Sequence, residues 1–212
     1  NQWPTQELQQ VVPEYLRLMT DLGHRLMALV ATGLGLEDSY FRESFSDDPT
    51  VLFRIFNYPA EPDNHLTWGV GEHTDMGFLT ILLQDQLGGL EVQSRDGSWL
   101  AAPPLPDTFV INIGDMLQHW TRGIYKATLH RVRNVAGHDR LSCPFFFDPH
   151  WQCKLQPIPR ERLRREELEA VEKDFFRGRW DGLELSALSA DQTYGDFVWS
   201  KIRDVFPWLS GK

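Results

Sequence analysis

Cysteine is scarce in this chain, and its scarcity excludes a disulfide-stabilised fold. Only Cys143 and Cys153 occur among the 212 residues. Small secreted domains that depend on disulfide bridges carry several pairs of cysteines. We therefore expect two unpaired thiols, a reducing compartment and a cytoplasmic protein.

Long hydrophobic runs and an excess of basic residues are also missing. No apolar run approaches the roughly 20 residues that a helix needs to cross a bilayer, and no signal peptide opens the sequence. The formal net charge is −9, and the charged segment at residues 160–167 mixes both signs. Nucleic-acid binders usually show a basic stripe instead. We therefore expect neither a membrane nor a nucleic acid as a partner.

Hydrophobic residues make up 42% of the chain, as in an ordinary globular protein long enough to bury a core. We find neither a linker nor an internal repeat in the sequence, so we expect one domain over residues 1–212. Apolar residues at helical spacing predict a long helix over residues 5–31, with Thr5 as its N-cap and Pro13 either kinking or starting it. Further helices are predicted at residues 36–45, 161–177 and 194–206.

Short apolar runs separated by turn residues fill the middle of the chain. They occupy residues 51–57, 78–83, 90–93, 99–101, 109–113, 127–132 and 141–147. Many short strands at such spacing are typical of a β-sandwich or barrel. Asp96-Gly97 predicts a hairpin between the third and fourth runs. The expected fold class is therefore mainly β with flanking helices.

Two histidines and one aspartate supply a candidate metal site. His73 and Asp75 are two positions apart and would point to the same side of an extended segment. His130 lies on a later run that could fold against them. Two imidazoles and one carboxylate form the donor set that leaves half of an octahedral iron(II) shell open, and no thiolate lies nearby to favour structural zinc.

A cation and a hydroxyl follow His130 on one face of the last run. Arg140, Ser142, Pro144 and Phe146 alternate along it and share that face. A buried arginine is costly unless it is paired, and this pattern offers no obvious carboxylate, so a bound anion would be a natural partner. The alternative is an arginine that reaches solvent at the rim of a barrel.

These motifs resemble, in order and spacing, the isopenicillin N synthase-like branch of the 2-oxoglutarate- and iron-dependent dioxygenases. The resemblance extends through nearly the whole chain. Family members normally carry a substantial N-terminal region before the first matching segment, so the resemblance implies that this region is missing here, either because the chain is trimmed or because its cavity is more open. The matching segments are residues 1–4, 58–59, 73–75, 79–84, 88–92, 112–115, 130–132 and 140–142.

The resemblance implies a double-stranded β-helix (jelly-roll) core and a role for each residue of the site. The three donors described above would bind iron(II), which would also take O2 and the keto acid end of 2-oxoglutarate. The far carboxylate of this co-substrate would meet Arg140, Ser142 and Tyr58. Asn112 and Leu90 would line the cavity near the metal.

The activity that the resemblance implies is oxidation of a small organic substrate, by hydroxylation or desaturation, coupled to decarboxylation of 2-oxoglutarate to succinate and CO2. Phe146, Trp68 and Trp120 are candidates for the substrate wall, and each could instead be ordinary core packing. Three alternatives stay open: an iron oxidase of the same fold that does not use 2-oxoglutarate, a nucleic-acid demethylase, and a catalytically silent jelly-roll binding domain. The acidic composition disfavours the demethylase.

Overall fold

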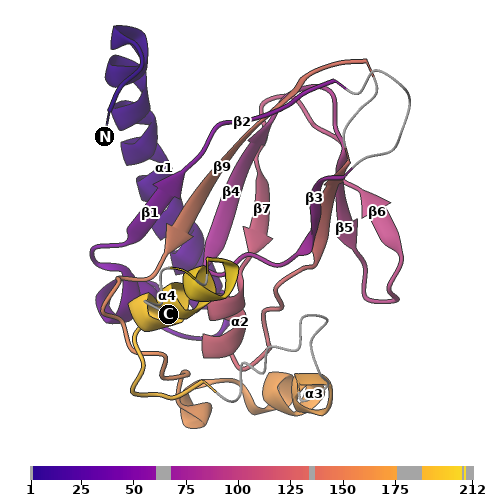
Figure 1. Ribbon diagram of the computed structural model, residues 1–212. Helices are drawn as coiled ribbons and strands as arrows, with labels where there is room; N and C mark the ends of the chain where they lie inside the picture. The colour runs from indigo at the N-terminus through magenta and orange to yellow at the C-terminus, as the bar shows by residue number, and fades with distance from the viewer. Residues whose placement is uncertain (1, 61–67, 134–136, 176–187, 207, 209–212) are drawn as a thin grey trace.

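The computed structural model describes residues 2–60, 68–133, 137–175, 188–206 and 208. Two antiparallel sheets form its centre; one long helix lies along the larger sheet, and the other helices gather at one end of the molecule (Figure 1). The large sheet has five strands in the order β1-β9-β4-β7, with β2 also paired to β9, and the small sheet has the order β3-β8-β5-β6. The predicted class, a mainly β jelly-roll core with flanking helices, is confirmed. The strands are β1 (Thr50–Phe53), β2 (Phe56–Tyr58), β3 (Trp68–His73), β4 (Leu79–Gln84), β5 (Leu90–Gln93), β6 (Trp99–Ala101), β7 (Val110–Ile113), β8 (His130–Arg133) and β9 (Arg140–Asp148).

The strands agree with most of the predicted runs. The hairpin at Asp96-Gly97 is confirmed, because β5 and β6 pair antiparallel and Gly97 adopts a φ of +87°, which favours glycine. Residues 51–57 form two strands and not one, because the chain leaves the strand conformation at residues 54–55. β3 matches no predicted run, since two glycines and two charged or polar residues interrupt its apolar pattern.

Side chains of β9 alternate between the hydrophobic core and the space between the sheets. Phe145 and Phe147 are fully buried in the core. Ser142, Pro144 and Phe146 point the other way and line a cavity that both sheets enclose. The period of two along a strand therefore divides β9 between the core and the cavity.

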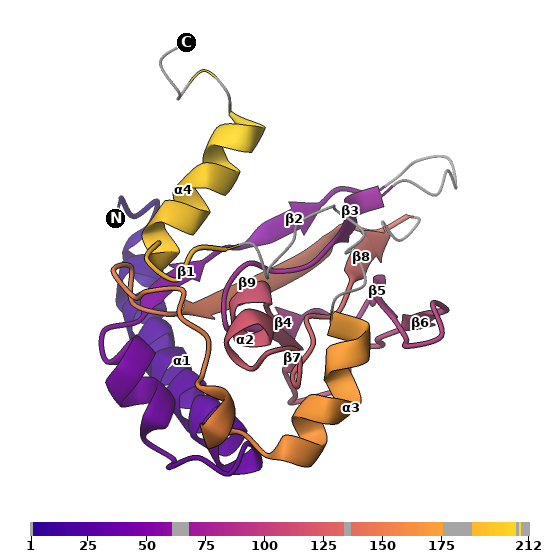
Figure 2. The same ribbon diagram turned by 90° about the horizontal axis from the view of Figure 1, so that it is seen from below.

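The hydrophobic core draws its residues from the large sheet and the helices. The helix α1 (Gln6–Gly33) contacts β4 and β9 on the face of the large sheet that is turned away from the small sheet (Figure 2). It approaches β9 so closely at Gly23 that a Cβ added there would lie 2.4 Å from the ring of Phe147. The larger sheet is thus fixed from behind, and its other face is left for the cavity.

The N-terminal helix begins as predicted. Oγ1 of Thr5 accepts a hydrogen bond of 3.3 Å from the backbone N–H of Leu8, so Thr5 is the N-cap. Pro13 lies inside the helix and does not start it. The second helix is predicted too early, because residues 36–39 are not helical; helical residues 40–41 lead into the π-helix Arg42–Ser46.

The two C-terminal helices are both present, but one of them begins later than predicted. The helix α4 (Tyr194–Val205) is confirmed and begins at a capping box formed by Thr193 and Asp196. The helix α3 (Arg165–Phe175) follows a separate 3-10 turn at Arg160–Arg162, and the last two residues of the prediction for 161–177 lie outside the described part. The helix α2 (Asp115–Trp120) is not predicted, since it is buried on nearly all sides and shows no amphipathic pattern. Among the described helices, none is long and apolar enough to cross a membrane.

Candidate functional site

Three candidate metal ligands meet where β3 and β8 pair. His73 ends β3 and lies opposite His130, the first residue of β8. Asp75 lies in the loop two residues beyond β3. Its Oδ1 is 3.7 Å from Nε2 of His73 and 3.8 Å from Nε2 of His130. The ligand atoms all lie within 4.8 Å of one another, a spacing that suits one metal ion.

Hydrogen bonds orient both imidazoles so that the same ring nitrogen faces Asp75. Nδ1 of His73 lies 2.8 Å from the carbonyl oxygen of Gly71, and Nδ1 of His130 lies 3.0 Å from that of Thr128. Because a carbonyl can only accept, each Nδ1 carries the proton and each Nε2 keeps a lone pair. Burial lowers the pKa of His73 and the nearby His130 lowers it further, which favours the neutral imidazole that a metal requires.

The carboxylate of Asp75 is held through its second oxygen. Oδ2 accepts hydrogen bonds from Oγ1 of Thr80 at 2.5 Å and from Nδ2 of Asn112 at 2.8 Å. The backbone N–H of Asp115, at the start of α2, donates to the carbonyl oxygen of Asp75 at 2.7 Å. Asn112 is not among the residues that line the cavity. The expectation of a cavity-lining asparagine is therefore corrected: Asn112 contacts and orients Asp75.

Arg140 is fully buried at the beginning of β9. Its Nε donates to the carbonyl oxygen of Gly88, and its Nη2 donates to Oε1 of Gln84 at 3.0 Å. Its guanidinium carbon lies 5.2 Å from the ring centroid of Tyr58, which is its partner across the two strands. Nη1 is buried and finds no hydrogen-bond acceptor in the described part of the chain.

A buried guanidinium with an unused donor fits an anion. Burial lowers the pKa of Arg140, but an arginine stays charged in proteins, and an unpaired buried charge is destabilising. The neighbouring cavity residue Ser142 is only 4% exposed and adds a hydroxyl. A carboxylate would satisfy both groups. Complete burial contradicts the alternative of an arginine that reaches solvent at a barrel rim.

One cavity of about 350 Å³ connects the candidate metal ligands with Ser142 and Tyr58. Pockets of this volume suit a small organic molecule or a co-substrate. Leu90 from the small sheet and Phe146 from the large sheet also line it. The three candidate metal ligands therefore border the same space as Tyr58 and Ser142, which lie next to the buried Arg140 on the paired strands.

Two tryptophans that were candidates for the substrate wall lie elsewhere. Trp120 is fully buried in the core, with its ring centroid 5.0 Å from those of Phe45 and Phe78. Trp68 is 47% exposed, and the guanidinium of Arg131 stacks on it at 4.3 Å. Neither residue lines the cavity. Core packing in one case and a cation–π contact outside the cavity in the other account for these side chains.

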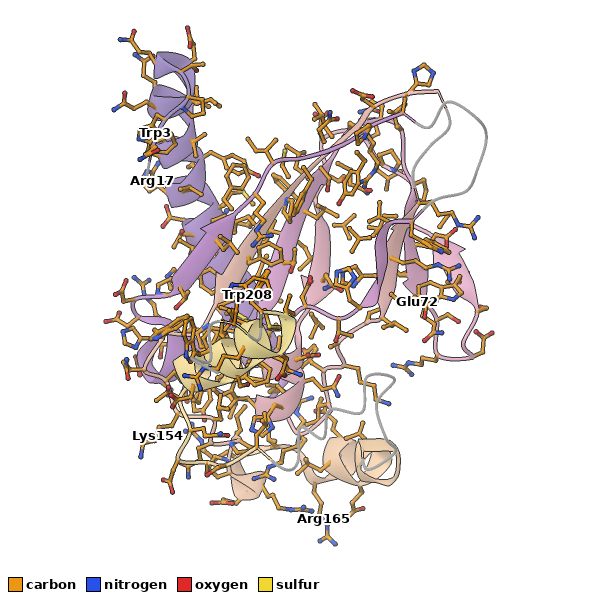
Figure 3. All side chains as sticks on the ribbon, in the orientation of Figure 1. Trp3, Arg17, Glu72, Lys154, Arg165 and Trp208 are labelled. Atoms are coloured by element: carbon orange, nitrogen blue, oxygen red, sulfur yellow. The ribbon has the colours of Figure 1, made fainter. Side chains whose placement is uncertain are left out.

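Arg131, on β8, contacts the three other strands of the small sheet on the side away from the cavity. Its guanidinium lies 3.8 Å from the ring centroid of Trp99, its Nη1 donates to Glu72 at 2.9 Å, and its Nε donates to Glu91 at 2.7 Å. Glu72 is on β3, where Figure 3 labels it. The β3–β8 pairing has register irregularities before it reaches His73, so these contacts help to keep the two histidine-bearing strands together.

Sequence analysis gave no role to four polar residues of the cavity wall: Arg54, Thr74, Thr80 and Asp148. Strand alternation would have identified two of them, because Asp148 follows Phe146 on the same face of β9 and Thr80 faces away from its buried neighbours on β4. The Tyr194 hydroxyl donates to Oδ2 of Asp148 at 2.7 Å. Burial nevertheless raises the pKa of Asp148 to about 7.

Comparisons with known proteins agree with this geometry. The family model described as the 2OG-Fe(II) oxygenase superfamily matches residues 48–149, which include all three candidate ligands and Arg140. A Dictyostelium discoideum protein named "Probable iron/ascorbate oxidoreductase" is 43% identical over 92% of this chain and 56% of its own length. A 1-aminocyclopropane-1-carboxylate oxidase from Dictyostelium mucoroides is 33% identical over 97% of this chain and 62% of its own length.

Among solved structures, the protein JOX2, crystallised in complex with 2OG, Fe and JA, has a similar fold. Its TM-score is 0.71 and its sequence identity is 32%, over 78% of this chain and 49% of the JOX2 chain. This chain therefore spans between 49% and 62% of the length of these three proteins.

Proposed function

Because the chain belongs to the 2OG-Fe(II) oxygenase superfamily, we propose that residues 1–212 form a single catalytic domain that oxidises a small organic substrate. The reaction is a hydroxylation or desaturation that consumes O2 and converts 2-oxoglutarate to succinate and CO2. One observation carries the proposal: three metal donors border the same cavity as Tyr58 and Ser142, which are the neighbours of a buried arginine with an unused donor.

His73, Asp75 and His130 are the iron(II) ligands in this proposal. The bound metal supplies the oxidising chemistry, and the protein supplies a fixed set of donors on one side of it. The Nδ1–H groups of both histidines donate hydrogen bonds to backbone carbonyls. Oδ2 of Asp75 accepts hydrogen bonds from Thr80 and Asn112. The remaining atoms, two Nε2 and one Oδ1, are therefore the ones that hold iron.

Arg140, Ser142 and Tyr58 bind the far carboxylate of 2-oxoglutarate. Nη1 of Arg140 is the unpaired donor, and Ser142, two positions further along β9, adds a hydroxyl that borders the cavity. Tyr58 lies directly across the strands from Arg140. A charge-assisted hydrogen bond in such a buried position is stronger than one in water. This arrangement fixes the orientation of the co-substrate, because its other end must reach the metal.

The prime substrate occupies the part of the cavity bordered by Phe146 and Leu90. These apolar walls exclude water and orient the reacting C–H bond. A space of about 350 Å³ suits a small molecule better than a nucleic acid, and the net charge of −9 favours the same choice. The free thiols of Cys143 and Cys153 fit a reducing compartment, so we assign the protein to the cytoplasm.

Succinate formation by the purified chain tests this function. Iron(II), 2-oxoglutarate and O2 are supplied together with a panel of small organic compounds, and succinate and O2 consumption are measured. We expect succinate that requires both iron and 2-oxoglutarate and that disappears in His130→Ala. Oxygen uptake without 2-oxoglutarate would favour the same-fold oxidase. Binding of both ligands without any succinate would favour a silent binding domain.

A further inference from the structure

Arg54 is a cavity residue with no role in iron or 2-oxoglutarate binding as described above. It lies between β1 and β2, and the even-numbered side chains of this segment, from Leu52 through Phe56 to Tyr58, line the cavity together with it. Its backbone N–H donates to the carbonyl oxygen of Pro144 at 3.1 Å. The backbone at Arg54 is therefore still attached to β9, although neither β1 nor β2 includes it.

The register of the strands places Arg54 between the two ends of the site. On one side, Phe56 pairs with Ser142 at the co-substrate end. On the other side, Leu52 pairs with Phe146. Phe146 in turn pairs with Thr80, which donates to the ligand Asp75. Arg54 thus lies between the proposed carboxylate site and the level of the metal.

The guanidinium of Arg54 has no acidic partner among the residues that the structure describes. Apart from the metal ligand Asp75, the acid in the cavity wall is Asp148. Asp148 lies four positions further along β9 than Pro144, or about 13 Å at the rise of an extended strand, and it accepts a hydrogen bond from Tyr194. The side chain of Arg54 instead lies 5.8 Å from the ring centroid of Phe56.

The wall around this cation is apolar. Leu52, Phe56, Pro144 and Phe146 are its neighbours along the paired strands and line the same cavity. One unpaired guanidinium beside an apolar wall is complementary to a molecule that has a carboxylate attached to an apolar body. A guanidinium can hold a carboxylate through two parallel hydrogen bonds.

We propose that Arg54 selects a prime substrate that carries a carboxylate next to an apolar group. This inference rests on the proposed oxygenase function, since it concerns the second organic molecule in the same cavity. The two cations have separate tasks. Arg140 is fully buried with an unused donor and takes 2-oxoglutarate, whereas Arg54 is exposed and meets a ligand that enters from solvent.

Binding to the iron- and 2-oxoglutarate-loaded protein without oxygen tests the assignment. Calorimetry would compare three acids, phenylacetate, 3-phenylpropionate and hexanoate, with their primary amides, which keep the size and lose the charge. We expect at least one acid to bind about 10-fold more tightly than its amide, as a charge-assisted contact allows. Arg54→Gln should remove this preference, and Arg54→Lys should keep part of it. Arg95→Gln, which removes an exposed charge in the β5–β6 turn, should not change it.

Each other result has a defined meaning. Equal binding of acids and amides, no binding of any acid, or an unchanged preference in Arg54→Gln overturns the assignment. A loss of 2-oxoglutarate affinity in Arg54→Gln as large as in Arg140→Gln would place Arg54 in the co-substrate site and also overturn it. Failure of the unaltered protein to bind 2-oxoglutarate would instead contradict the proposed function. An acid preference that depends on Arg54 would in that case still support the role of Arg54 in binding a carboxylate.

Discussion

Nδ2 of Asn112 donates a hydrogen bond of 2.8 Å to Oδ2 of Asp75, 37 positions away in the chain. The other oxygen of the same carboxylate, Oδ1, faces Nε2 of both histidines. The amide therefore decides which oxygen of Asp75 is available to a metal. Thr80 donates to Oδ2 as well, so the carboxylate is oriented before any ion binds.

Replacement of Asn112 should weaken the metal site without unfolding the protein. We expect Asn112→Ala to lower iron(II) affinity about 10-fold, the usual scale for loss of a group that orients a ligand. Asn112→Asp should be worse, because it keeps the shape and places a second carboxylate against Asp75. Competitive metal titration measures both. Ile111→Ala, on the exposed side of the same strand, is the control, and equal affinities in all variants would contradict the orienting role.

Removal of the Arg140 guanidinium should affect the co-substrate and spare the metal. Loss of one partner of a buried, hydrogen-bonded charge pair costs about 2–4 kcal/mol, or roughly 30- to 1,000-fold in affinity. Arg140→Gln should therefore raise the KM for 2-oxoglutarate strongly, and Arg140→Lys should raise it less. Iron titration should give the same affinity as in the unaltered protein. An unchanged KM in Arg140→Gln would mean that the co-substrate carboxylate binds elsewhere.

The carboxyl of Asp148 should make the metal-free protein less stable as the pH rises. Burial raises its pKa to about 7 in the folded state, from an ordinary value of 3.8. Between these values the folded state holds the proton and the unfolded state has released it. The stabilisation that is complete below pH 3.8 is therefore lost as the pH rises through about 7.

Asp148→Asn isolates this effect, because the amide keeps an acceptor for Tyr194 and does not titrate. Urea unfolding of the metal-free proteins at pH 5 and pH 8 should show the unaltered protein losing free energy of unfolding relative to Asp148→Asn. Metal at Asp75 should reduce the difference, since it offsets a negative charge that raises the pKa of Asp148. Parallel pH dependences of the two proteins would show that Asp148 is ionised throughout.

Trp120 and Phe146 should respond differently to substitution, although both were candidates for the substrate wall. Trp120→Phe shrinks a fully buried core side chain and should lower the free energy of unfolding by about 1–3 kcal/mol. The KM for the prime substrate should not change. Phe146→Leu should change this KM at a stability cost of less than about 1.5 kcal/mol. Chemical denaturation and steady-state kinetics on both variants check the distinction, and a KM effect confined to Trp120→Phe would reverse it.

Local patterns in the sequence predict the elements whose side chains alternate or whose turns have a fixed chemistry. The hairpin at Asp96-Gly97 and the N-cap at Thr5 are examples, because each depends on residues that are close in the chain. The shared face of Ser142, Pro144 and Phe146 also follows from strand periodicity alone. To predict that His73 lies opposite His130, one must also know which two strands pair, and strand periodicity does not provide this.

Several of the features that sequence analysis missed depend on contacts between distant segments, unlike Thr80 and Asp148, which strand alternation would have identified. Asn112 shows no local sign that its amide faces Asp75 and not the cavity. The role of Trp120 was ambiguous because tryptophan occurs both in hydrophobic cores and in binding sites. Its burial against Phe45 and Phe78 assigns it to the core. The helix that contains Trp120 was missed for a related reason, since tertiary packing on nearly all sides removes the amphipathic signal.

The alternation along β9 determines which positions can be mutated to alter substrate selectivity without loss of folding. Positions 144, 146 and 148 border the cavity, whereas Phe145 and Phe147 are fixed in the core. New substrate preferences can therefore arise by mutation at the even-numbered positions, while the unchanged odd-numbered positions keep the core packed and the protein folded. A combinatorial library restricted to those three sites should yield many folded proteins with altered selectivity, and one at 145 and 147 should yield few that fold.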